Sequence, residues 1–98
     1  MYLAVVHVEP SLHFHLILTF ENGEKRLFNM SPYLNLGIFK ELNDIAKFNA
    51  VKVSFDSIEW ENGADMDPEI LYTESTALET QMASEPKAEY GNKKQLPK

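Results

Sequence analysis

The chain has 98 residues, of which 15 are acidic and 9 are basic, so its formal net charge is −6. A chain of this length has room for one small hydrophobic core, and its negative field repels the phosphate backbone of nucleic acids. Cysteine is absent, which excludes disulfides, thiolate metal sites and a cysteine nucleophile and fits a reducing compartment. We therefore expect one cytoplasmic domain that does not bind nucleic acid by itself.

Residues 2–9 predict the first strand, because valine favours β structure and Pro10 cannot extend a ladder of hydrogen bonds. Both faces of this strand are apolar, which indicates a position inside the sheet or under a partner. The apolar run lacks a basic region before it and is too short for a membrane helix. We expect neither secretion nor insertion into a membrane.

Residues 13–20 show the clearest period-two pattern in the chain, which is typical of a strand with one buried face. The apolar face carries Phe14, Leu16, Leu18 and Phe20. The opposite face carries His13, His15, Ile17 and Thr19.

The dipeptide Asn22-Gly23 follows this strand and favours a two-residue type I′ hairpin turn, because both positions tolerate positive φ. Counting outward from that turn pairs Leu18 with Leu27 and Ile17 with Phe28, and paired residues share a face. This register predicts Leu18 and Leu27 in the core. It leaves Ile17 and Phe28 on the opposite face, which then needs cover from the C-terminal tail or from another subunit.

Residues 31–48 predict short helices that lie over the sheet. Ser31-Pro32 is typical of a helix start, although a glycine interrupts that helix after about one turn. The helical spacing of Ile38, Leu42 and Ile45 then predicts one apolar stripe, and Asp44 is placed to cap a further turn.

Residues 51–60 predict a second hairpin, with its turn at Asp56-Ser57. The strand that ends at Trp60 alternates apolar and acidic residues, as expected of one buried and one solvated face. We expect six aromatic residues in the core: Phe14, Phe20, Phe39, Phe48, Phe55 and Trp60. Three others are expected to be more exposed: Phe28, Tyr33 and Tyr72.

The segment after Trp60 predicts a turn and then a capped helix. Asn62-Gly63 tolerates positive φ, Asp67 suits an N-cap, and Pro68 suits the first helical position, where its missing donor is not needed. The run 70–72 provides apolar anchors for that helix.

The composition changes near residue 77. Residues 77–98 contain one aromatic side chain and neither valine nor isoleucine, which is too little apolar surface to offset the entropy of ordering. We expect a single domain over residues 1–76 and a flexible polar tail over 77–98. The predicted fold is α+β, a small antiparallel sheet of four to five strands with short helices packed on one face.

Three sequence blocks, in this order along the chain, resemble the small bacterial domain-of-unknown-function family 2442. They are residues 20–28 (FENGEKRLF), residues 37–42 (GIFKEL) and the pattern Trp60-x-x-Gly63-x-Asp65-Met66-Asp67-Pro68-Glu69. The resemblance covers about residues 1–75 and implies a compact α+β domain with an antiparallel sheet, without catalytic residues. Genes of similar proteins often lie beside a small toxin-like partner, so the resemblance also implies an antitoxin role.

Two clusters could hold a metal ion. Asp65, Asp67 and Glu69 supply carboxylates of the kind that calcium or magnesium prefers, but they lack the spacing of a calcium loop. His13 and His15 would lie about 7 Å apart on one strand face, with His7 as a third zinc ligand only in a suitable register. A helix cap and solvated strand histidines explain the same residues, so we expect no cofactor.

The favoured function is a non-enzymatic protein–protein interaction module, and a metal-binding protein or small enzyme that uses Asp65, Asp67 and Glu69 is the alternative. Residues 1–76 hold 5 basic and 12 acidic side chains, a net charge of −7, which attracts a basic partner. That partner is a basic, toxin-like protein or a second copy of the chain. The expected interaction surface consists of Ile17, Phe28, Trp60, Asp65 and Tyr72.

Overall fold

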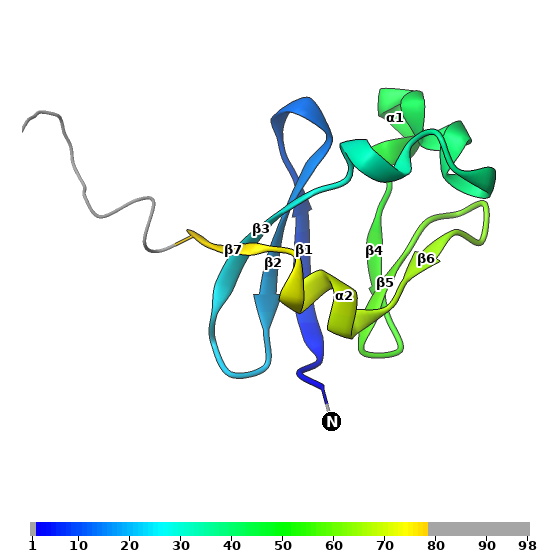
Figure 1. Ribbon diagram of the computed structural model, residues 1–98. Helices are drawn as coiled ribbons and strands as arrows, with labels where there is room; N and C mark the ends of the chain where they lie inside the picture. The colour runs from blue at the N-terminus through cyan, green and yellow to red at the C-terminus, as the bar shows by residue number, and fades with distance from the viewer. Residues whose placement is uncertain (1, 79–98) are drawn as a thin grey trace, which may run out of the picture.

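The computed structural model describes residues 2–78 of the chain. Within this part, one antiparallel sheet has the strand order β1-β2-β3-β7 and a second has the order β4-β5-β6 (Figure 1). The strands are β1 (Val5–Pro10), β2 (His15–Phe20), β3 (Lys25–Asn29), β4 (Lys52–Ser54), β5 (Ser57–Glu59), β6 (Asp65–Met66) and β7 (Thr76–Ala77). The predicted α+β class is confirmed, with the strands divided between two sheets.

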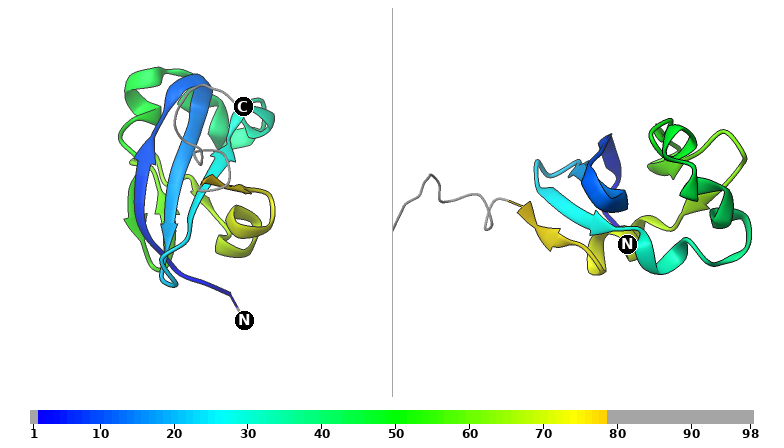
Figure 2. Two further views of the ribbon diagram at one scale, coloured as in Figure 1. Left: turned by 90° about the vertical axis from the view of Figure 1, so that its left-hand side faces the viewer. Right: turned by 90° about the horizontal axis from the view of Figure 1, so that it is seen from above.

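The helices are short, as predicted. They are the α-helices α1 (Ile45–Phe48) and α2 (Pro68–Thr73) and the 3-10 helices η1 (Leu12–Phe14), η2 (Ser31–Tyr33) and η3 (Gly37–Asn43). Seen from above, β1 to β3 lie on one side of the molecule and β4 to β6 with α1 lie on the other (Figure 2). None of the helices described between residues 2 and 78 has both the length and the apolar character needed to cross a bilayer.

The two sheets meet along β1 and β4. β1 is an edge strand of the first sheet, and its Val5 N–H donates to the carbonyl oxygen of Asp56 at 2.9 Å, in the turn that follows β4. An irregularity in the β1–β2 register between Val5 and His7 accommodates Val6 as an extra residue. Val5 is buried in the core, whereas Val6 is exposed.

The predicted register of the first hairpin is wrong by one residue. Leu16, not Ile17, lies opposite Phe28, because the connection has three residues rather than two. Phe20 N–H donates to Glu24 O at 2.9 Å, and the only positive φ in the turn is that of Gly23, at 91°. A three-residue turn with glycine at its left-handed position shifts every residue of β3 to the other face. Phe28 therefore packs in the core at 1% exposure and is not on the outer face.

Residues 60–64 form the same turn a second time. Trp60, like Phe20, is followed by Glu-Asn-Gly, and its N–H donates to Ala64 O at 2.8 Å. Gly63 has a φ of 92°, and Asn62 Oδ1 accepts the Ala64 N–H at 3.0 Å. The predicted turn at Asn62-Gly63 is confirmed, and the chain thus uses one local sequence, Glu-Asn-Gly, for two of its three-residue turns.

The second hairpin turns one residue earlier than predicted. Ser54 pairs with Ser57, so the turn residues are Phe55 and Asp56, with φ values of 48° and 69°. Two consecutive left-handed residues are the geometry that matches the twist of a hairpin. Phe55, predicted in the core, is 98% exposed.

The core lies between the two sheets, where α2 and the segment 30–48 also contribute buried residues. Trp60 is 1% exposed and its Nε1 donates to Phe48 O at 2.9 Å, so its expected place in the core is confirmed. The predicted stripe on residues 38–45 is wrong in part, since Leu42 is buried but Ile38 and Ile45 are 46% and 52% exposed. A 3-10 helix repeats every three residues, and therefore Ile38 and Leu42, four apart in η3, do not share its buried side. Ile45 belongs to α1, which begins after the extended residue Asp44 has ended η3.

The α2 helix begins as predicted. Asp67 caps it by accepting the Glu69 N–H at 2.8 Å, and Pro68 occupies the first turn. After α2 the chain forms β7, in which Ala77 pairs with Arg26. Ala77, assigned to the tail from the sequence, thus belongs to the sheet, and residues 79–98 of the predicted tail lie outside the described part.

Candidate interaction surface

One end of the molecule brings together four segments that are distant in sequence (Figure 1). They are residues 2–3, the turn 21–24, the turn 55–56 and the start of α2, residues 67–70. The residues that follow 2–3 connect it to both turns: Glu21 N–H donates to Ala4 O at 2.8 Å, and Val5 N–H donates to Asp56 O at 2.9 Å. We call these four segments the acidic end.

The acidic end carries the exposed carboxylates of Glu21, Asp56, Asp67 and Glu69, and the half-buried one of Glu24. The hydroxyl of Tyr2 donates to Asp56 Oδ2 at 3.2 Å. The negative charge of Asp56, this hydrogen bond and the charges of Glu21 and Asp67 raise the pKa of the Tyr2 phenol. Tyr2 therefore lies in the field of three carboxylates that come from three different segments.

Phe55 is the most exposed large apolar side chain of the described residues, at 98%. Its φ of 48° is unusual for a residue with a bulky side chain. A left-handed backbone at a residue other than glycine destabilises the fold by roughly 1–2 kcal/mol. Burying the ring would stabilise the fold by ~1.5–3 kcal/mol, but a solvated ring makes no such contribution. Nothing in the packing of residues 2–78 explains a phenylalanine at this position.

Two hollows lie beside the turn 55–56. A groove of about 590 Å³ is lined by Tyr2, Leu3, Glu69, Ile70, Tyr72 and Thr73. A smaller hollow of about 210 Å³ has Phe55, Glu59, Asp65 and Pro68 in its wall. The turn touches both, because Phe55 lines the smaller hollow and Asp56 binds the Tyr2 hydroxyl in the groove.

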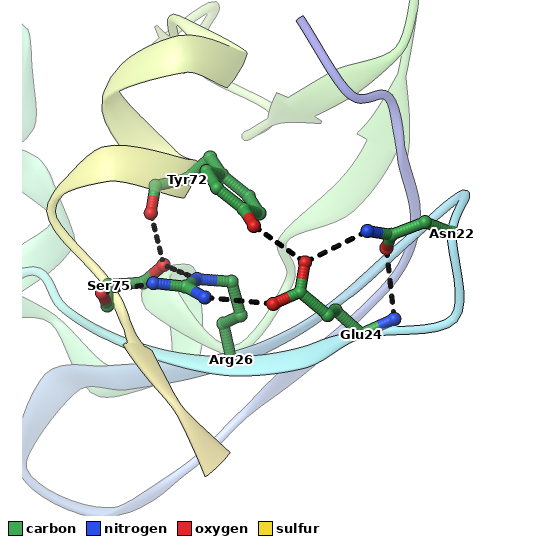
Figure 3. Close-up of polar contacts among 5 residues, drawn as sticks. All are labelled: Asn22, Glu24, Arg26, Tyr72 and Ser75. Carbon is green, nitrogen blue, oxygen red and sulfur yellow. Dashed lines mark hydrogen bonds and ion pairs between the residues drawn. The ribbon is translucent and has the colours of Figure 1, made fainter. Parts of the chain in front are cut away.

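A polar network fixes the position of Tyr72 in the groove (Figure 3). Tyr72 donates its hydroxyl to Glu24 Oε1 at 2.6 Å, and Arg26 Nη1 binds Glu24 Oε2 at 3.1 Å. The guanidinium carbon of Arg26 also lies 4.3 Å from the centre of the Tyr72 ring, and Arg26 donates from Nε and Nη2 to Ser75 at 2.7 Å.

These contacts shift two pKa values in opposite directions. The hydrogen bond from Tyr72 lowers the pKa of the Glu24 carboxyl, with further help from Asn22 and Arg26. The same bond to a carboxylate raises the pKa of the Tyr72 phenol. The network thus ties α2 to β3 with a neutral tyrosine and an ionised glutamate. Sequence spacing could have indicated only the ion pair of Glu24 and Arg26, which are two residues apart, since Tyr72 is 48 residues away from Glu24.

The five residues predicted to form the interaction surface lie in different environments. Phe28 and Trp60 are each 1% exposed, so the prediction that they offer a surface is wrong. Ile17 lies on the outer face as predicted, but its half-buried neighbour there is Leu27. Asp65 is exposed and Tyr72 lines the groove. The sequence did not reveal Phe55, because its turn lacks the glycine or asparagine that marks most tight hairpin turns.

Of the three carboxylates considered as metal ligands, Asp67 has a structural role. Asp67 is occupied by its helix cap, and Asp65 lies opposite Glu59 in the second sheet. Among residues 2–78, no three histidine, cysteine, aspartate or glutamate side chains are grouped as they would be around a metal ion.

The predicted histidine pair does not share a strand face. His13 precedes β2, with a φ of 57°, so it is not in the strand that holds His15. His15 Nδ1 lies 3.1 Å from the carbonyl oxygens of Leu12 and His13, to which it can donate. His7 lies on β1 opposite Thr19.

Residues 5–77 match the family described as Protein of unknown function (DUF2442), and the chain belongs to that family. The resemblance inferred from the three sequence blocks is thereby confirmed. No curated protein and no solved structure matches the chain.

Proposed function

We propose that this chain is a non-enzymatic protein–protein interaction module whose partner is a basic protein, towards which it acts as an antitoxin-like or regulatory subunit. One observation carries this proposal, the 98% exposure of Phe55 on a left-handed backbone beside carboxylates. Residues held in such sparsely populated backbone conformations cluster at functional sites, such as active sites and ligand clamps. Aromatic side chains, phenylalanine among them, are also enriched at the centres of protein–protein interfaces.

The charge of the domain supports a basic partner. Residues 1–76 have a net charge of −7, and Glu21, Asp56, Asp67 and Glu69 place part of it around the exposed apolar side chains. Complementary charge accelerates encounter and excludes like-charged competitors, while a buried aromatic ring supplies affinity. A cytoplasmic location is part of the proposal, and the absence of cysteine supports it.

Affinity capture from the native cell with the tagged full chain tests the proposal. A matched pair of variants gives it a control: Phe55→Ser at the acidic end and Leu12→Ser, at a side chain that is 78% exposed in the connection between β1 and β2. Figure 1 shows that connection at the other end of the molecule. We expect the wild type and Leu12→Ser to retain one basic protein and Phe55→Ser to lose it. Light scattering of the pure chain distinguishes this outcome from self-association. A chain that retains no basic protein would contradict the proposal.

A further inference from the structure

The groove between residues 2–3 and α2 has an apolar, preformed wall. Tyr2, Leu3, Ile70 and Tyr72 supply this wall, within a volume of about 590 Å³. Tyr72 is held by Glu24 and Arg26, and Tyr2 is held by Asp56. Because these two rings are already positioned by other contacts, a ligand would not have to order them, which lowers the entropic cost of binding.

The surroundings of the groove are negative. Glu69 lies in its wall, and Asp56, Glu21 and Asp67 act on its Tyr2 hydroxyl. Arg26 contacts the groove residue Tyr72, and its charge is already engaged by Glu24, Ser75 and the Tyr72 ring. An apolar ligand would leave the carboxylates without a counter-charge, and a simple cation would leave the aromatic wall in water. A ligand that satisfies both needs apolar groups and positive charge together.

We propose that this groove is the docking site for a segment of a partner protein in which lysine or arginine alternates with apolar side chains. The apolar side chains pack between Tyr2 and Ile70, and the basic side chains pair with Glu69 and the carboxylates around Tyr2. This inference rests on the proposed function and adds to it the site and the chemistry of the segment that is bound. Phe55 then contacts the same partner outside the groove, next to Asp56.

The test uses the full chain labelled with ¹⁵N and a short synthetic peptide in which arginine and leucine alternate, with a matched peptide in which glutamate replaces arginine. We expect the basic peptide to shift the amide signals of Leu3, Ile70 and Thr73, and the acidic peptide to shift none of them. Glu69→Lys should lower the affinity for the basic peptide at least about tenfold, because one attractive charge is replaced by a repulsive one. Glu9→Lys, an exposed position on β1, is the matched control and should have no such effect.

Three results would overturn the inference. First, the basic peptide could fail to bind the groove, or its affinity could be unchanged both by Glu69→Lys and by Thr73→Lys, a second exposed position on α2. The free chain could be a dimer that Glu69→Lys dissociates, so that the groove holds a second copy. Lastly, Glu69→Lys could shift the amides of residues 87–98, which hold four lysines, and the chain's own C-terminal segment would be the occupant.

Failure of the groove differs from failure of the proposed function. If a basic protein is captured through Phe55, and Glu69→Lys and Thr73→Lys do not reduce its capture, the docking site in the groove is refuted while the proposed function is supported. If no basic protein is captured and the peptide does not bind, both are lost.

Discussion

Two tight turns at opposite ends of this molecule (Figure 1) hold a phenylalanine in the same unfavourable backbone conformation, but only one of the two rings packs against the core. His13 and Phe14 have φ values of 57° and 60°, and Phe55 and Asp56 have 48° and 69°. The Phe14 ring packs edge-on against Phe48, with ring centres 5.1 Å apart, and is partly buried. The Phe55 ring is 98% exposed.

The difference between these two turns separates what the fold requires from what it does not. At Phe14, core packing offsets the cost of the left-handed backbone, so stability alone explains the residue. At Phe55 the backbone cost is similar and no packing within the described chain offsets it. The carboxylates around the second turn add a charge pattern that does not involve the core. We therefore assign the first turn to the fold and the second to binding.

Alanine substitution at both rings should give the largest difference. We expect Phe14→Ala to lower the free energy of unfolding by about 2 kcal/mol, since a partly buried ring is lost. Phe55→Ala should change it by less than about 0.5 kcal/mol, since a solvated ring is lost. Chemical denaturation of the two variants measures both values. Equal losses would show that Phe55 contributes to the fold and would remove the contrast.

Asparagine tolerates a left-handed backbone, and asparagine substitution therefore tests the backbone strain at each turn, although at Phe55 it removes the ring as well. Phe55→Asn and His13→Asn should each raise the free energy of unfolding, by roughly 0.5–1 kcal/mol. Only Phe55→Asn should also abolish capture of the basic partner. If the stabilised Phe55→Asn variant still captures the partner, the strained residue is not retained for binding.

Local sequence patterns predicted the structure correctly where a side chain interacts with residues a few positions away in the chain. Asp67 and Pro68 start α2, and Asp44 caps α1 by accepting the Ala46 N–H at 3.0 Å, both as expected. The alternating pattern of residues 15–20 forms β2 with its even-numbered residues buried. Each of these features depends on spacing within a few residues, which the sequence displays directly.

The errors arose where one residue of loop length decides the outcome. Glu-Asn-Gly closes a three-residue turn after Phe20 and after Trp60, although Asn-Gly alone also fits a two-residue turn. A register shift of one residue exchanges the two faces of β3, and Phe28, predicted on the surface, therefore lies in the core. The candidate site could not be assembled from sequence either, because its four segments meet only after the two sheets have packed.

The smallest predicted effect concerns the phenols of the two groove tyrosines, Tyr2 and Tyr72. Hydrogen bonding to Glu24 raises the pKa of Tyr72, and Asp56 raises that of Tyr2, because the neutral hydroxyl is favoured beside a carboxylate. A raised pKa stabilises the fold fully below the ordinary value of about 10, and this contribution is lost as the pH rises through the folded-state value. The free energy of unfolding should therefore fall above about pH 10. Tyr72→Phe should make this fall less steep, and an identical slope would contradict the role given to the Tyr72–Glu24 bond.

The central claim is that the acidic end binds a basic protein through Phe55, and the dissociation constant of the captured complex tests it most directly. It should be measured for the wild type, Phe55→Ser and Leu12→Ser at two salt concentrations. We predict at least about tenfold weaker binding for Phe55→Ser, no change for Leu12→Ser, and weaker wild-type binding at high salt because attraction between exposed charges is screened. Equal affinities for the two variants, or an affinity that is independent of salt, would contradict the claim.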